Sequence, residues 1–255
     1  MNGEDEIFVI GEVKNKEFIG ITPSNSRAIL IKFLQENLID KGKVIEAWSM
    51  DMSKLFKSAC QEIAPQAPIV IDKYHVISLV NKTIDLCRVA TEKSLNERFQ
   101  IKRLLLMKTS TFDKLCKSEK PKWQYKTNFF KKVLIEHKEI RILWDLKNTV
   151  HIFYKCKKKT SIDKYWNRIF KLLKQHETIH PEFRELRKTL LNWEEEILNY
   201  FTIRITNAYI EGLNNRIETL KRKKFGFRNK ERFLKSIAYA LLPITIFIAN
   251  TIFTH

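Results

Sequence analysis

Two short apolar runs, each ending in an aspartate, constrain the fold of this chain more than any other feature. Val44–Met50 is followed by Asp51, and Pro68–Ile71 is followed by Asp72. The residues after both runs have the apolar spacing of amphipathic helices. The run Pro68–Ile71 is short and fully apolar, as is typical of a strand in a parallel sheet buried on both faces. The pattern therefore predicts an α/β layer with both aspartates at the carboxyl ends of strands, where functional side chains gather.

A hairpin is predicted near the start of the chain. Glu6–Val13 and Glu17–Thr22 are rich in β-forming residues, and Lys14–Lys16 separates them. Turn residues then precede an amphipathic helix over Arg27–Ile39. We expect the hairpin to join the two later strands in one mixed sheet, which makes the fold class α/β.

The character of the sequence changes between residues 92 and 200. Strand patterns stop, and long amphipathic helices follow one another. We therefore divide the chain into a first core segment (residues 1–91), an all-α insertion (residues 92–200) and a last core segment (residues 201–255). Four tryptophans spread through the insertion are predicted to anchor its core rather than to stack on DNA bases: Trp123, Trp144, Trp166 and Trp193.

The charge balance indicates a polyanionic partner. The chain has 47 Lys and Arg against 29 Asp and Glu, a formal net charge of +18. Such an excess favours nucleic acid and, more weakly, an anionic membrane surface. The N-terminus lacks a signal-peptide pattern and the four cysteines form no CxxC pair, so we expect a cytoplasmic protein with reduced thiols. Pro243 and Asn250 interrupt the uncharged run Ser236–Phe253, which we expect to be a buried helix with a tail rather than a membrane span.

One helix over Thr206–Arg228 is predicted to carry a carboxylate and then a basic end. Glu211 lies at the edge of its apolar stripe, and Gly212 beside it leaves room for a backbone, a metal or a phosphate to come close. The alternative is a surface helix with a solvated charged face. The basic residues expected to contact DNA phosphates lie on this helix, after it, and in a lysine cluster upstream: Lys221, Arg222, Lys223, Lys224, Arg228, Lys230, Arg232, Lys157, Lys158 and Lys159.

Carboxylates on neighbouring strand ends, together with one on a later helix, suit a site for Mg²⁺ or Mn²⁺. Two such ions can activate an attacking oxygen and stabilise the leaving oxygen in phosphodiester chemistry, so no Ser or Cys nucleophile is needed. Each candidate also has a structural alternative. Asp51 and Asp72 are both suited to capping helices, and His75 is suited to packing.

Two long segments resemble one family. Residues 44–88, VIEAWSMDMSKLFKSACQEIAPQAPIVIDKYHVISLVNKTIDLCR, closely resemble a block of the ISL-three family of bacterial insertion-sequence transposases. Residues 206–233, TNAYIEGLNNRIETLKRKKFGFRNKERF, resemble that family's C-terminal block. The order of the segments, the strand-end aspartates, the acidic-xx-His turn and the Glu-Gly-Leu-Asn-Asn helix all match. The resemblance implies a ribonuclease H-like core interrupted by an all-α insertion. It also implies two aspartates and a glutamate that cut and rejoin DNA with two Mg²⁺ (or Mn²⁺) ions.

Carried over to this sequence, the resemblance implies that Glu211 is the final acid and a metal ligand. Topology favours Asp51 as the middle acid and the other metal ligand. Asp72 belongs to the most recognisable motif, so the choice between the two aspartates stays open. His75 and Asn215 are expected to line the site.

Family members carry a first catalytic aspartate before the hairpin, and DNA-binding segments before that. We therefore expect this chain to be a DNA transposase that lacks its first aspartate and its specific DNA reader. The alternatives are a non-catalytic DNA-binding remnant and, from another class, a helical membrane-surface protein. The resemblance further implies double-stranded DNA as the partner, a homodimer on paired DNA ends, and association with the nucleoid in a bacterial cytoplasm.

Overall fold

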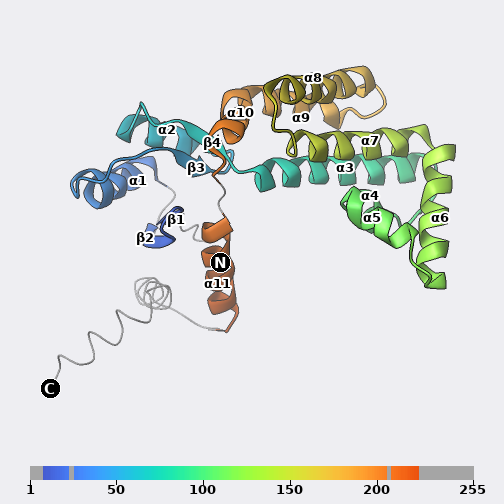
Figure 1. Ribbon diagram of the computed structural model, residues 1–255, viewed down its shortest axis with the longest axis horizontal. Helices are drawn as coiled ribbons and strands as arrows, with labels where there is room; N and C mark the ends of the chain where they lie inside the picture. Colours follow the sequence, from blue (N-terminus) through green and yellow to red (C-terminus); the bar gives the residue numbers. More distant parts are fainter. Residues whose placement is uncertain (1–7, 23–25, 206–207, 224–255) are drawn as a thin grey trace. The chain divides into compact units, whose positions relative to one another are not determined.

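The computed structural model describes residues 8–22, 26–205 and 208–223, which form mostly helices and two small sheets (Figure 1). This composition is compatible with the expected α/β class. The chain divides into two compact units. The first, here called the sheet unit, combines Met1–Asp72 with Thr202–His255. The second, the helical unit, is Lys73–Phe201.

The predicted hairpin is confirmed. β1 (Phe8–Glu12) and β2 (Glu17–Thr22) pair antiparallel, and Lys16 adopts a left-handed backbone with φ 55° in the turn between them. Because successive side chains of a strand point to opposite faces, the hairpin presents two apolar faces. One face contacts the cluster built on α1 (Arg27–Leu34), and the other contacts α11 (Ala208–Lys223).

The helix expected over Arg27–Ile39 also forms, with a change of geometry along it. The α-helix α1 ends at Leu34, and a π-helical segment, η1 (Gln35–Ile39), continues it. Its buried face holds Leu30, Leu34 and Leu38, which cluster with Ala59 of α2 (Lys54–Ile63). These leucines recur at four-residue spacing, so a single apolar stripe continues across the two segments.

The two strands that end in aspartates are shorter than the apolar runs that predicted them. β3 (Trp48–Met50) and β4 (Ile69–Ile71) pair in parallel. Within the described ranges they form a two-stranded sheet of their own, and the hairpin forms another. The single mixed sheet expected from the sequence is therefore not present in this part of the chain. Instead, side chains of the hairpin and of β3 meet through the shared leucine cluster on α1.

The helical unit begins at Lys73, earlier than residue 92, the start expected for the insertion. The reason is that α3 is continuous from Lys73 to Ser94 and packs along α7 and α9. The unit's helices in chain order are α3 (Lys73–Ser94), α4 (Lys102–Leu106), α5 (Thr109–Cys116), α6 (Pro121–Glu136), α7 (Lys138–Phe153), α8 (Lys159–His176), α9 (Glu182–Asn192) and α10 (Glu194–Ile203).

Aromatic side chains make much of the core of the helical unit. Trp166 and Trp193 are buried, as the prediction of core anchors requires, and Trp166 donates a hydrogen bond to Glu194 at 2.7 Å. Trp144 is half-buried in edge-to-face contact with Phe112 and Phe130. Such aromatic pairs add to the free energy gained from burial alone.

No helix in the described part of the chain is long and apolar enough to cross a membrane. The uncharged run Ser236–Phe253, predicted to be a buried helix with a tail, lies outside the described residues.

Lys147 of α7 is a buried lysine. Only 1% of the residue is exposed, and its ammonium donates a hydrogen bond of 2.6 Å to the Met107 carbonyl. The same nitrogen lies 3.3 Å from the centroid of the Trp144 ring. Burial lowers the pKa of Lys147 to about 7, and the nearby charge of Asp113 only partly opposes that shift.

The lowered pKa of Lys147 predicts a stability that rises with pH. Between about pH 7 and pH 10 the unfolded chain keeps the Lys147 proton that the folded chain has lost, so the free energy of unfolding increases by at most about 1.4 kcal/mol per pH unit. Lys147→Met keeps the packing and removes the titration. Urea denaturation of both proteins at several pH values should give a slope in wild type that Lys147→Met lacks. Equal slopes would show that Lys147 does not titrate in this window.

Candidate functional site

The parallel pairing of β3 and β4 brings Asp51 and Asp72 to the same edge of their sheet. Met50 is the register partner of Ile71, so each aspartate is the next residue beyond a paired position. The Asp72 backbone N–H donates a 3.2 Å hydrogen bond to the Met50 carbonyl. The strand-end positions expected from the sequence are therefore those of the structure.

Asp51 is not a helix cap. Ser53 caps α2, and its hydroxyl accepts a 3.4 Å hydrogen bond from the Phe56 backbone N–H. Asp51 lies two residues before this cap and is half-buried. The structural alternative considered for Asp51 is therefore wrong, and its carboxylate is left for another role.

One carboxylate oxygen of Asp51 is buried without a compensating contact. Within the described ranges, Oδ1 has no hydrogen-bond partner, and the same holds for Trp48 Nε1 and Ser49 Oγ on the preceding strand. An unsatisfied buried polar group costs about 1–3 kcal/mol, more if it is charged. Of these three atoms, only the carboxylate oxygen is a ligand that Mg²⁺ and Mn²⁺ prefer. The donor chemistry at Asp51 thus fits a hard divalent cation.

Asp72 is fully buried and directly precedes Lys73, the first residue of α3. Asp72 therefore occupies both the strand end and the N-cap position of a helix. Its position is compatible with a site carboxylate and with a helix cap. His75 lies in the first turn of α3 and is half-buried.

Glu211 lies in the first turn of α11 and is half-buried. Leu213 and Ile217 hold this helix against the hairpin by packing on apolar residues of β1 and β2.

Two glycines near this helix, Gly11 and Gly212, have different surroundings. A Cβ on Gly11 of β1 would lie 2.8 Å from Ile210 Cδ1 and 2.9 Å from the Glu17 carbonyl oxygen, so a glycine is what lets the helix approach the strand.

The space around Gly212 is open, in contrast to that around Gly11. Among the described residues, no atom outside the helix's own backbone and the neighbouring residues lies within 4 Å of the position that a Cβ would take. Internal packing therefore does not require a glycine at this point of α11. Asn215, one turn further along, is exposed. Within the described ranges, no side chain of another element covers the helix surface at Gly212, beside Glu211.

The described residues contain no group of three His, Cys, Asp or Glu side chains close enough to hold one metal ion. The structure therefore brings Asp51 and Asp72 to one sheet edge, but it does not assemble them with Glu211 into one ligand set. The contacts of α11 are with the hairpin rather than with β3 and β4.

The predicted lysine cluster is exposed. Lys157 and Lys158 lie between α7 and α8, and Lys159 is the first residue of α8. Lys221, Arg222 and Lys223 form the last turn of α11. The remaining predicted DNA-binding residues lie outside the described ranges: Lys224, Arg228, Lys230 and Arg232.

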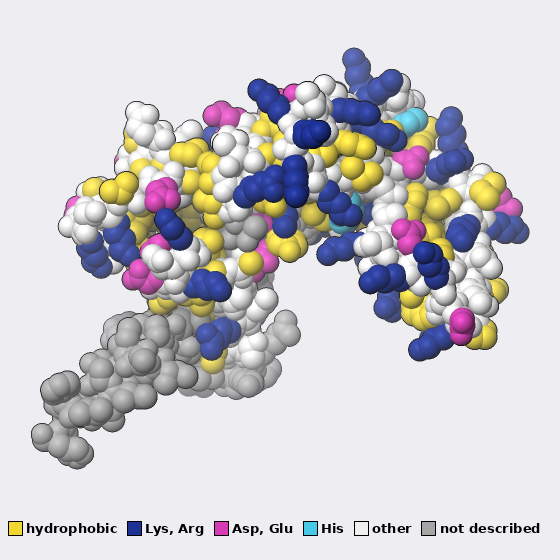
Figure 2. Space-filling model, viewed as in Figure 1, with side chains coloured by type: hydrophobic (Ala, Val, Ile, Leu, Met, Phe, Trp, Pro, Cys, Tyr) yellow, Lys and Arg dark blue, Asp and Glu magenta, His cyan; other side chains and the backbone are white. Residues whose placement is uncertain are grey.

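Sequence reasoning missed the basic surface that continues along α8. Figure 2 shows Lys and Arg side chains gathered around this helix. The spacing of these residues places them on its outward side, and this spacing was the signal that could have identified them. The exposed basic residues of α8 beyond its first turn are Lys164, Arg168, Lys171 and Lys174.

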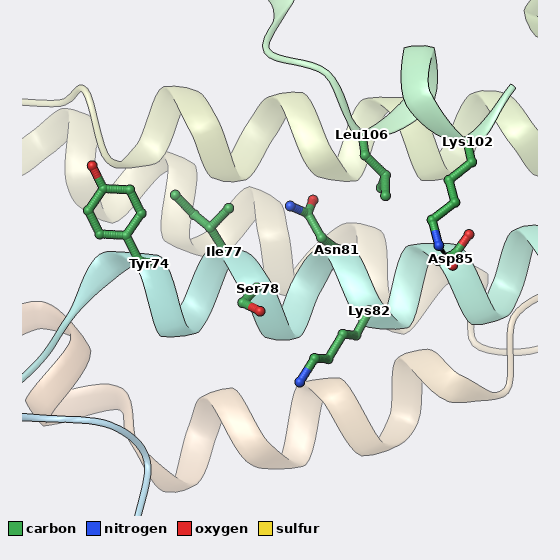
Figure 3. Close-up of a pocket in the computed structure, with 8 residues that line it drawn as sticks. All are labelled: Tyr74, Ile77, Ser78, Asn81, Lys82, Asp85, Lys102 and Leu106. Carbon is green, nitrogen blue, oxygen red and sulfur yellow. Dashed lines mark ion pairs between the residues drawn. The ribbon is translucent and has the colours of Figure 1, made fainter. Parts of the chain in front are cut away.

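A pocket of about 360 Å³ lies between α3 and α4 in the helical unit and contains none of the predicted site residues (Figure 3). In this pocket the ammonium of Lys102 lies 2.6 Å from a carboxylate oxygen of Asp85. Burial opposes ionisation of Asp85, but hydrogen bonds from Lys102 and Arg88 outweigh this effect and lower the pKa of that carboxyl. Lys102 and Asp85 therefore neutralise each other. The lining residues are Tyr74, Ile77, Ser78, Asn81, Lys82, Asp85, Lys102 and Leu106.

The contact between Gly11 and α11 predicts the effect of adding one methyl group. Gly11→Ala should destabilise the protein by about 1–3 kcal/mol, since the new Cβ overlaps a helix side chain and a strand carbonyl. Gly212→Ala is the matched control because its Cβ would meet no other element among the described residues. Denaturant titrations of both variants measure the difference. Equal stabilities would contradict this packing of α11 on β1.

Comparisons with known proteins agree with the resemblance seen in the sequence. The family model for ISL3 transposases of the DDE type matches residues 3–237. The transposase for insertion sequence element IS1001 from Bordetella parapertussis is 22% identical over 240 residues, which are 91% of this chain and 56% of that protein. The chain thus spans little more than half the length of this curated relative. No solved structure matches. Since the family model covers most of the sequence, the chain belongs to the ISL3 family of transposases.

Proposed function

We propose that this chain is the catalytic part of a DDE-type DNA transposase with a ribonuclease H-like core, which cleaves DNA strands and joins them to new ends. Membership of the transposase family supports the reaction class. The observation that carries the proposal is the in-register placement of Asp51 and Asp72 with one Asp51 oxygen buried and unsatisfied in the described part of the chain.

Asp51 and Glu211 would hold two Mg²⁺ or Mn²⁺ ions. When bound, such ions supply activation of an attacking oxygen and stabilisation of the leaving oxygen. Asp51 contributes an anionic oxygen that is already desolvated, which strengthens its attraction for a cation. Asp72 is the alternative middle acid, and His75 and Asn215 line the site.

Basic residues would bind the DNA backbone. Lys157–Lys159, which are exposed, and the basic residues at the end of α11 supply positive charge, so binding is expected to depend on salt and little on sequence. The proposed partner is double-stranded DNA, that is, transposon ends and target. A homodimer on paired ends, in the bacterial cytoplasm, completes the proposal.

The acidic residues predict a specific loss of cleavage. Asp51→Asn and Glu211→Gln should each lower Mg²⁺-dependent nicking of supercoiled plasmid by more than about 100-fold, because each removes a ligand that acts as part of one unit. Glu218→Gln, an exposed acid on the same helix, should retain activity. In Mn²⁺ titrations followed by electron paramagnetic resonance, Asp51→Asn and Glu211→Gln should bind Mn²⁺ more weakly than wild type. Glu218→Gln should bind it as tightly as wild type.

A chain that binds DNA equally with and without Mg²⁺, and that cleaves none, would contradict the catalytic proposal and favour DNA binding alone. Undiminished cleavage by Glu211→Gln would remove Glu211 from the site.

Gly212 offers an independent test of what approaches α11. A glycine inside a helix costs about 1 kcal/mol relative to alanine, and no other element in the described part of the chain fills the space beside Gly212. Gly212→Ala should therefore raise the melting temperature. If phosphate or metal approaches this surface, the same variant should lose DNA cleavage and retain DNA binding through the lysines. Unchanged cleavage in a stabilised variant would show that no close approach occurs there.

A further inference from the structure

The outward side of α6 carries two exposed aromatic side chains. Tyr125 is 73% exposed and Phe129 is 38% exposed. Together with Asn128 and Lys132 they are spaced i, i+3, i+4 and i+7, so the four share one side of the helix. We call these four residues the outer face of α6. The opposite side of the helix carries buried residues and packs on α5 and α7.

Lysines border the outer face on both sides. By helical spacing, Lys122 and Lys126 lie beside Phe129, and Lys131 lies on the other side of Asn128; all three lysines are exposed. Glu136 is the acidic residue of α6, and its carboxylate is 3.6 Å from Lys132. The face therefore combines two exposed rings with an excess of positive charge.

This combination selects among possible ligands. Protein–protein interfaces are enriched in aromatic residues but depleted in lysine. Helices that lie on membranes need a broad apolar side, whereas α6 turns its apolar side into the core and flanks its exposed rings with Asn128 and lysines. Single-stranded nucleic acid needs both features present here, because its bases stack on rings while its phosphates contact cations.

We propose that the outer face of α6 binds unpaired DNA bases, with Tyr125 and Phe129 as stacking platforms and the bordering lysines on the phosphates. In an intact duplex the bases stack on one another, so their faces are closed to these rings. Cleaved or opened strands present such faces. The inference rests on the proposed action on DNA. It adds that the helical unit recognises single-stranded rather than double-stranded DNA.

The test measures binding of the full chain to two fluorescent probes by anisotropy. One probe is a single strand of about 20 thymidines, longer than a typical single-strand site. The other is a blunt duplex of equal length. Tyr125→Ala combined with Phe129→Ala should weaken binding to the single strand by about 10- to 100-fold. Binding to the duplex should change by less than a factor of three.

Matched variants separate stacking from other causes. Ile135→Ala removes an apolar side chain that is 78% exposed on the same helix but has no ring, and it should leave both affinities unchanged. Tyr125→Trp should retain single-strand binding. Circular dichroism of the double variant should match wild type, because both rings point outward. A loss in Ile135→Ala equal to that of the double variant would overturn the stacking inference.

Further outcomes distinguish this inference from the function on which it rests. Duplex binding with single-strand affinity unaffected by the double variant would overturn the inference alone. A wild-type chain that binds neither probe would overturn the proposed function as well. Pelleting of wild type with phosphatidylserine vesicles, lost in the double variant, would reassign the outer face of α6 to lipid.

Discussion

The parallel pairing of two three-residue strands is the constraint on which the candidate site depends. Ile69, Val70 and Ile71 are all buried, and their burial holds β4 in register with β3. Because the register is fixed, Asp51 and Asp72 leave the sheet side by side. The unsatisfied oxygen on Asp51 is a free-energy cost that this apolar packing must offset. Such a cost is characteristic of functional sites rather than of stable cores.

The sheet unit depends on two places where a helix side chain comes unusually close to a strand. Gly11 admits Ile210 of α11, and Gly20 admits the ring of Phe33 from α1. A two-stranded hairpin is at best marginally stable alone. Its stability here comes from apolar packing on both faces, by the α1 cluster on one and by α11 on the other. The position of Glu211 is thus a consequence of hairpin packing.

The lysines of the helical unit differ in burial. Lys147 is buried at a cost in pKa and contacts a carbonyl and a ring of its own unit. The exposed lysines of α8 and α6 instead lie where solvent, and any polyanion, can reach them. An exposed charge is worth little to stability, so these lysines contribute little to folding.

Much of the fold could be predicted from local pattern. The hairpin, the helix after it and the two strand-end aspartates follow from apolar periodicity, which depends on neighbours within a few residues. The basic side of α8 and the outer face of α6 were equally readable from helical spacing. The choice of Ser53 over Asp51 as the cap of α2 was not, because both residue types cap helices well.

The sequence by itself determined the family, the types of element and the residues that carry charge. Only the tertiary structure decided that the hairpin and the β3–β4 pair are separate sheets in the described part of the chain. It also decided that α3 belongs to the helical unit from its first residue, and that α11 packs on the hairpin. These outcomes depend on contacts between segments far apart in the chain. Local periodicity specifies which face of an element is buried, but not which distant element covers it.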